Sequence, residues 1–474
     1  MINEITPEIT LSKNSEVHKS KDKKDKKDKK DKKNKAKVEP IVEDKVEPES
    51  LESKKEEEIC TLLRDNEVCP SLVIQAKLAP QLERRCCGYK GRCKPLFNTK
   101  TRLTAVTTPT VAGQYINVKV HSSYIGYVTI TCLDMGNGNI GMMSYVKGMP
   151  NQPDILVKAI DATRNNLDYN LDYDIRYLVQ LPVSIVNREK CSQNFDIITS
   201  LRLKEKSSPL TTIEKETLNK SLVYNNVIDI HYNTCINVTR LHRTVGINNF
   251  VPSNILLSIH NIANYDNAFF YGSMWYGNGR YQFYSLGTMD ITFHEQGHGT
   301  NDMIADLPYE GHSGAINEMF ADINGFYGEY DSCKVNYDAD PLNNVDEVAD
   351  WVMGEEACRF MAYLRNFQDP TKAQQPAEYK GLYWADPNST ADYGGVHTNS
   401  GVGNKCFYEF CMRAGIDIGY RIFMAALRLL PTRPNYINLR DALKQAAGIE
   451  YKTQMQEALN IVKMTDTMVN DWTV

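Results

Sequence analysis

The chain has 474 residues, 42% of them hydrophobic, and a formal net charge of −5. This length allows two or three domains, and the hydrophobic content excludes a mainly disordered chain. The weakly acidic balance argues against a dedicated nucleic-acid-binding protein. No apolar run is long enough for a transmembrane helix, and no apolar stretch after Met1 marks a signal peptide. We therefore expect a protein that is either cytoplasmic or exported by a non-classical route.

Residues 1–58 form a segment of unusual charge. Its Lys19–Lys37 stretch holds twelve lysines and four aspartates, a net charge of +8, and residues 38–58 then turn acidic. Too few apolar residues are present to offset the entropy of ordering, so we expect a disordered charged tail. A tether to nucleic acid or to an anionic surface is the alternative.

Residues 59–100 contain five of the twelve cysteines: Cys60, Cys69, Cys86, Cys87 and Cys93. Their spacing matches no zinc finger, so we expect a small Cys-containing appendage, with disulfide-linked and reduced forms both open.

Residues 101–288 favour strands, because turn signals separate alternating stretches such as Tyr127–Thr131. His231 also falls in a strand-like stretch rich in β-branched residues, and we expect it and His260 to be structural. Residues 289–474 favour helices, for example over Tyr420–Leu430 and Leu439–Ala447. The chain is therefore predicted to have an α+β fold with a β-rich N-terminal lobe and an α-helical C-terminal lobe.

The stretch His294–His298 reads H-E-x-x-H. On a helix, residues four apart share one face, so both imidazoles can bind one zinc ion. A glutamate, Glu318, follows twenty residues after His298 and can complete the site from a second helix. Glu295 would then lie beside the open position as a general base for an attacking water.

The second helix has its own signals. Ser313 is predicted as its N-cap, and Ile316, Met319 and Phe320 recur at helical spacing. Glu318 and Asp322 lie four apart on a neighbouring face, which supplies one carboxylate for a metal and one to orient a ligand histidine.

These motifs resemble the thermolysin family of zinc metallopeptidases, and the similarity covers roughly residues 101–474. Further stretches carry the resemblance: Asn267–Phe270, Tyr276–Gly279, Leu364-Arg365 and Asp392–Gly401. It implies a zinc-dependent endopeptidase with two lobes and an active site in the cleft between them.

The resemblance also implies a role for each catalytic residue. His294, His298 and Glu318 would hold Zn²⁺, and Glu295 would be the general base. Tyr309 and His397 would stabilise the oxyanion. The residues that would orient the three histidines are Asp322 for His294, Asn317 for His298 and Asp392 for His397.

On the substrate side, the resemblance implies that Asn267 and Ala268 hold an extended peptide and that Arg365 binds a carbonyl next to the cut. Leu364 and Ile291 would line an apolar pocket, so cleavage would precede bulky hydrophobic residues. We expect peptide or protein substrates and a monomeric enzyme.

Calcium is a secondary expectation from the same resemblance. Asp290, Glu329, Asp350 and Glu355 fall at positions where the family holds Ca²⁺, which prefers carboxylate oxygens. Val352 stands where a further carboxylate is expected, which puts a second ion in doubt.

Three other functions are compatible with the sequence. The chain could be a binding protein that kept the fold without catalysis, although the ligands, base and oxyanion histidine are all present. It could act mainly through its tail, as an interaction protein. It could also be an enzyme that stays inactive until its first hundred residues are removed.

Overall fold

The computed structural model describes residues 114–123, 126–136, 138–150, 153–164, 178–182, 189–246, 255–339 and 350–473. The charged tail expected over residues 1–58 and the Cys-containing appendage expected over 59–100 lie outside these ranges. The described residues all belong to one structural unit.

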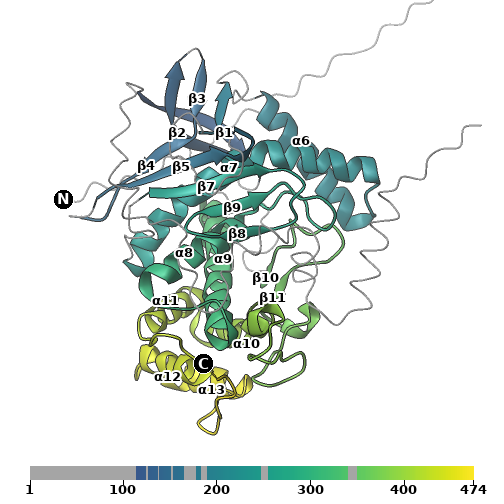
Figure 1. Cartoon of the computed structure of the whole chain (residues 1–474). Coiled ribbons are helices and arrows are strands. Elements are labelled where there is room, and N and C mark those ends of the chain that lie inside the picture. Colours follow the sequence, from purple (N-terminus) through teal and green to yellow (C-terminus); the bar gives the residue numbers. More distant parts are fainter. Residues whose placement is uncertain are drawn as a thin grey trace, which may run out of the picture. The chain divides into compact units, whose positions relative to one another are not determined.

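A four-stranded antiparallel sheet in the order β1-β2-β3-β6 comes first along the chain, and Figure 1 labels its strands β1, β2 and β3. Its strands are β1 (Tyr115–Ser122), β2 (Gly126–Gly136), β3 (Asn139–Gly141) and β6 (Gln180–Pro182). The strand expected around Tyr127–Thr131 is thus confirmed as part of β2. A short turn joins β2 to β3, where Asp134 Oδ1 accepts the Gly136 amide at 2.8 Å.

A second, five-stranded sheet has the order β4-β5-β7-β9-β8. Its strands are β4 (Met143–Val146), β5 (Ile155–Asp161), β7 (Ile255–Ile262), β8 (Ala268–Phe270) and β9 (Met274–Gly277). The strand pairs β5–β7 and β7–β9 are parallel, and β5 and β7 are buried over most of their length, as parallel strands usually are. Strand β8 pairs antiparallel with β9 and forms an edge of the sheet.

Two long helices interrupt the region that the sequence favoured as β-rich: α6 (Glu189–Ser207) and α7 (Thr212–Val245). Helix α7 begins with a capping box, in which Thr211 and Glu214 satisfy each other's backbone amides, and it ends at the left-handed Gly246. The strand expected around His231 is wrong, because His231 lies within α7. Burial of this helix against strands and helices overrides the local β propensity.

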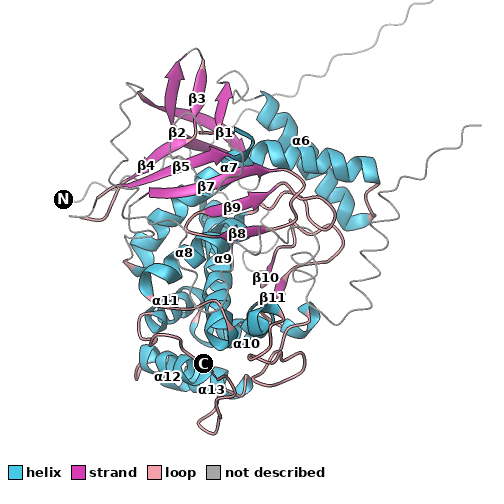
Figure 2. Cartoon of the chain, viewed as in Figure 1, coloured by secondary structure: helices cyan, strands magenta, loops and turns pink. Residues whose placement is uncertain are grey.

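Helices dominate from Met289 onward (Figure 2). They are α8 (Met289–Ile304), α9 (Gly311–Ala339), α10 (Asp392–Ala414), α11 (Ile416–Leu427), α12 (Tyr436–Ala447) and α13 (Lys452–Ile461). The helices predicted near Tyr420 and Leu439 are confirmed as α11 and α12. Ser313 is not an N-cap, because α9 begins at Gly311.

Helix α9 packs between α8 and α10, and α8 also contacts β8 and β9 of the second sheet. A small antiparallel pair, β10 (Val352–Met353) with β11 (Arg365–Asn366), lies against α9 and α10. The largest apolar cluster spans these helices, so it fixes α8, α9 and α10 relative to one another. None of the described helices is both long and apolar enough to span a bilayer.

Candidate metal centre

The two histidines of the H-E-x-x-H motif meet on one face of α8. His294 and His298 are one helical turn apart, and their Nε2 atoms lie 3.1 Å from each other. Every residue of α8 from Met289 to Asn301 is buried, including these polar side chains. Buried polar groups need compensating partners, so the contacts of each histidine decide what it can do.

Glu318 reaches the same point from α9. Its carboxylate oxygens lie 3.6 Å from His294 Nε2 and 3.4 Å from His298 Nε2. Ligands bound about 2.0–2.1 Å from a tetrahedral zinc ion stand about 3.3 Å apart. The three separations therefore fit one small, tetrahedrally bound cation.

The far side of each imidazole is held by a neighbour. His298 Nδ1 donates to Asn317 Oδ1 at 2.9 Å, which leaves Nε2 unprotonated and facing Glu318. Asn301 fixes the orientation of that amide by donating to the same oxygen at 2.8 Å. His294 Nδ1 lies 3.0 Å from Asp322 Oδ1.

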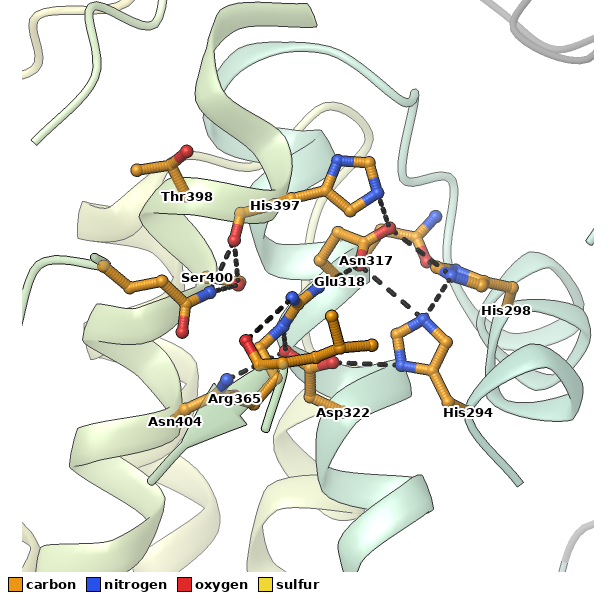
Figure 3. A network of polar contacts seen from close by, with 12 residues as sticks. His294, His298, Asn317, Glu318, Asp322, Arg365, His397, Thr398, Ser400 and Asn404 are labelled. Carbon is orange, nitrogen blue, oxygen red and sulfur yellow. Dashed lines mark hydrogen bonds and ion pairs between the residues drawn. The ribbon is translucent and has the colours of Figure 1, made fainter. Parts of the chain in front are cut away.

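The carboxylates of α9 are charged although they are buried. Burial opposes charge on Glu318, but three nearby histidines and Arg365 outweigh it and hold its pKa well below the usual range. Arg365 is itself buried, with Nη2 3.3 Å from Glu318 and Nε 3.0 Å from Asp322 (Figure 3). Asn404 also donates to Asp322 at 2.8 Å. The carboxylate of Glu318 is thus available to bind a metal, and that of Asp322 is available to orient His294.

Glu295 lies between the two histidines on α8 and is 5% exposed. Its Oε2 atom has no hydrogen-bond partner among the described residues. Burial is the main reason that its pKa rises to about 8. A carboxylate with a pKa near neutrality, and with a free oxygen, is suited to exchange a proton with a reacting molecule.

Tyr309 and His397 both lie beside Glu318 and contact each other. The Tyr309 hydroxyl lies 3.0 Å from His397 Nε2 and also donates to Glu318. Asp392 accepts from His397 Nδ1 at 2.6 Å and from the His397 amide at 3.0 Å. Burial lowers the pKa of His397, but Glu318 and Asp392 raise it to about 10, so this imidazole carries a positive charge near neutral pH.

A left-handed turn delivers His397. Four consecutive residues, Asp392–Gly395, have φ values from 49° to 85°. Gly394 and Gly395 adopt this conformation freely, whereas Asp392 and Tyr393 are strained. Strain of this kind persists only where surrounding contacts fix the backbone, and here it brings the Asp392 carboxylate under the imidazole.

A second group of acidic residues includes Asp290, in the first turn of α8. Carboxylate oxygens of Asp290, Glu329 and Glu355 converge to within 4.8 Å of one another. Burial raises the pKa of all three, and nearby carboxylates raise those of Glu329 and Glu355 further. Asp350, the fourth residue expected here, is not in this group, and its carboxylate accepts the Val352 amide at 3.2 Å.

The substrate-side residues lie on neighbouring elements. Asn267 precedes the edge strand β8, where its carbonyl accepts the Gly277 amide at 3.0 Å, and Ala268 opens the strand. Leu364 is half-buried beside Arg365, and Ile291 is buried on α8. Their contact with a substrate stays a prediction.

Several neighbours of the centre were missed from the sequence. Asn301 and Asn404 orient Asn317 and Asp322, and Glu356 lies beside the acidic group, where burial and Asp290 help raise its pKa to about 8. The pair Glu355-Glu356 was a visible signal for the last of these, whereas nothing local marks the two asparagines.

Comparison with known proteins agrees with this geometry. The model of the thermolysin metallopeptidase catalytic domain matches residues 155–302, and that of the α-helical domain matches residues 305–468. Neutral protease NprE of Bacillus pumilus is 31% identical over 226 residues, which cover 46% of this chain and 69% of that protein. The chain belongs to the thermolysin family. The expected fold is therefore confirmed, with sheets in the N-terminal part and helices in the C-terminal part.

Other relatives of the thermolysin family match over shorter shares of their length. Bacillolysin of Bacillus amyloliquefaciens is 33% identical over 234 residues, 48% of this chain and 41% of that protein. The chain thus spans about two fifths of that relative. Among solved structures, the precursor of protealysin from Serratia proteamaculans aligns with 22% identity and a TM-score of 0.42, over 51% of this chain and 79% of that one.

Proposed function

We propose that this chain is a zinc-dependent endopeptidase that cleaves peptide bonds before bulky hydrophobic residues. The observation that carries the proposal is the triangle of His294, His298 and Glu318, whose separations of 3.1–3.6 Å suit a tetrahedral ion. Thermolysin itself is a standard example of a two-histidine, one-glutamate catalytic zinc site. Zinc bound there would acidify a water molecule and polarise the substrate carbonyl.

Glu295 is the proposed general base. Its unpartnered Oε2 would take a proton from the attacking water and then pass it to the leaving nitrogen. It lies between the two ligand histidines in sequence, yet it is not one of the three converging ligand atoms. It is therefore free to move a proton while the metal stays bound.

Tyr309 and His397 are the proposed oxyanion donors. Both already approach one anionic oxygen, Glu318 Oε1, which His397 Nε2 reaches at 3.5 Å. An oxyanion formed beside Glu318 would lie within reach of the same two groups. The positive charge on His397 strengthens this stabilisation.

The substrate would lie along β8 as an added strand, held by Asn267 and the Ala268 backbone. Contacts between α8 and β8 place this edge beside the helix that carries Glu295. Leu364 and Ile291 would form the apolar wall, and Arg365, already bound to Glu318, would reach a substrate carbonyl.

A calcium ion at Asp290, Glu329 and Glu355 is a further part of the proposal. Three acidic groups whose oxygens converge repel one another, and a divalent cation would remove that repulsion. Glu355 Oε2 and Glu356 Oε2 are buried without a hydrogen-bond partner among the described residues, so both could bind a cation.

The test is cleavage of a quenched peptide with leucine or phenylalanine after the scissile bond. Wild type, wild type with a zinc chelator and Glu295→Ala would be compared. Glu457→Ala is the matched control, because this exposed glutamate pairs only with Arg413 among the described residues. We expect cleavage by wild type and by the control alone. No cleavage by folded, zinc-loaded wild type, either intact or trimmed of its first hundred residues, would exclude the proposed activity.

A further inference from the structure

The segment Val469–Thr473 lies beyond the part of the chain that the family models match, which ends at residue 468. It is nevertheless held by a dense set of contacts. Trp472 is 6% exposed, and Asp471 accepts a hydrogen bond from the Tyr379 hydroxyl at 2.7 Å. The family match therefore does not account for these contacts.

Trp472 packs directly on the backbone of Gly311, at the start of α9. A Cβ atom on Gly311 would overlap the indole ring, and its φ of +49° also favours glycine. Gly311 follows Tyr309 by two residues and precedes Glu318 by seven. The indole therefore presses on the short link between an oxyanion donor and a metal ligand.

His312, next to Gly311, is fully buried in an aromatic cage that includes Trp472. The ring centroids of Tyr379, Trp384, Tyr436 and Trp472 lie 5.2–6.1 Å from that of His312. Asp471 Oδ1 approaches His312 Nε2 to 3.1 Å. Asp471 and Trp472 thus hold both the backbone and the side chain of the first turn of α9.

The same segment is also tied to the turn that delivers His397. Asn388 donates to the Asp471 carbonyl at 2.7 Å and accepts the Thr473 amide at 2.9 Å. Next to it, the Pro387 carbonyl abuts Gly394, where a Cβ atom would also lie 2.9 Å from Gly311 Cα. The backbones of Gly311 and Gly394 are therefore in close contact, and the Trp472 indole packs on Gly311.

We propose that Asp471 and Trp472 are positioning residues that set the distance between Tyr309 and His397. Trp472 fixes Gly311, Gly311 fixes Gly394, and Gly394 lies three residues before His397. This role rests on the proposed function, because it acts through the two oxyanion donors.

The expected effect is on turnover more than on substrate binding. Loosening the two turns misaligns donors that act in the transition state, while β8 and the apolar wall stay in place. A displacement of about 1 Å can cost about a hundredfold in rate. For Trp472→Ala we expect kcat to fall about tenfold to a hundredfold and KM to change less than about threefold.

The experiment compares Trp472→Ala, Trp472→Phe and Asn388→Ala in the full chain, alone and combined with Tyr309→Phe. We expect Trp472→Phe to restore much of kcat, and the Trp472→Ala loss to shrink in the Tyr309→Phe background. Met464→Ala removes a buried side chain from the same end of the chain and serves as the matched control. Asn388 is exposed, so Asn388→Ala tests the contact between this turn and the segment Val469–Thr473 even if Trp472→Ala does not fold.

An unchanged kcat in folded Trp472→Ala would overturn the inference. If Trp472→Ala does not fold, an unchanged kcat in Asn388→Ala would overturn it instead. An equal loss in Met464→Ala, or full additivity with Tyr309→Phe, would do the same, since either marks general destabilisation. Amide hydrogen exchange over residues 308–314 and 391–397 gives a readout that needs no activity. Wild type that cleaves nothing would refute the proposed function. Faster exchange of both stretches in Trp472→Ala would still support the positioning role of Trp472.

Discussion

Tyr309 and His397 are 88 residues apart in the chain, yet the tyrosine hydroxyl lies 3.0 Å from the imidazole Nε2. Tyr309 precedes α9 and His397 follows the left-handed turn that opens α10, so the packing of these two helices decides their distance. The two side chains form one donor pair aimed at the region of Glu318.

If this pair stabilises the oxyanion, removing one donor should cost about 10²–10³ in kcat. We expect this loss for His397→Ala and a smaller one for Tyr309→Phe, because the tyrosine is neutral. The double variant should lose less than the product of the two, since each supports the other. Steady-state kinetics measures this, and multiplicative losses would show that the two residues act independently.

The two glutamates of the centre should behave differently. Glu318→Gln should lose zinc and activity together, whereas Glu295→Gln should keep zinc and lose about 10²–10⁴ in turnover. The reason is geometric: Glu318 contributes an oxygen to the converging group and Glu295 does not. Metal content by mass spectrometry beside kcat checks this, and zinc loss in Glu295→Gln would contradict it.

Asn317 should matter for metal affinity although it touches no metal. Asn317→Ala removes the acceptor that fixes the His298 tautomer, so zinc affinity should fall about 10–100-fold. Competition with a chelator of known affinity measures the change. Asn460→Ala, an exposed asparagine on α13, should bind zinc like wild type. Equal affinity in both variants would disprove the role.

Calcium should weaken the pH dependence of stability near neutrality. In the folded protein, burial and nearby acidic groups raise the pKa of Glu356 to about 8 from 4.5. Between these values the folded state binds more protons than the unfolded chain, so calcium-free stability should fall as pH rises from about 4.5 to 8.

Melting curves with EGTA and with excess Ca²⁺, taken from pH 5 to pH 8, test this prediction. Calcium should raise the melting temperature most at the upper end, where the carboxyl groups are ionised. Glu329→Gln should weaken the response to calcium, while Glu457→Gln should leave it unchanged. A calcium effect that is equal at both ends of the range would rule out this site.

His231 should limit stability in acid. It is fully buried, Nε2 lies 2.7 Å from Ser144 Oγ, and burial lowers its pKa to about 4 from 6.5. Between these two values His231 is protonated in the unfolded chain but neutral in the folded protein. The free energy of unfolding therefore decreases as pH falls from 6.5 to 4.

The loss amounts to about 3 kcal/mol, from the shift and about 1.4 kcal/mol per pKa unit. His231→Gln lowers stability at neutral pH but should flatten this slope. Urea unfolding at pH 7 and pH 4.5 separates the two effects. The same slope in both proteins would mean that other groups, such as His260, carry the acid sensitivity.

The cluster of His294, His298 and Glu318 could be predicted from sequence because its geometry is mostly local. His294 and His298 share a face for any helix at that position, and the pattern of Glu318, Asp322 and their apolar neighbours marks a second helix. The helices near Tyr420 and Leu439 were also predictable, since periodicity reports which face of a helix is buried. Helix α7 was missed, because the β-branched residues around His231 favoured a strand, although the capping box of Thr211 and Glu214 is a local helix signal.

What only the tertiary structure decided is how distant groups meet. Asn301 and Asn404 act on the site through Asn317 and Asp322, and no spacing rule connects Asn404 to residues some eighty positions earlier. The contact of Trp472 with Gly311 is of the same kind, because it requires a glycine with positive φ and an indole brought from the far end of the chain. Local sequence fixes which groups one helix presents, whereas the packing of helices against each other fixes which of them touch.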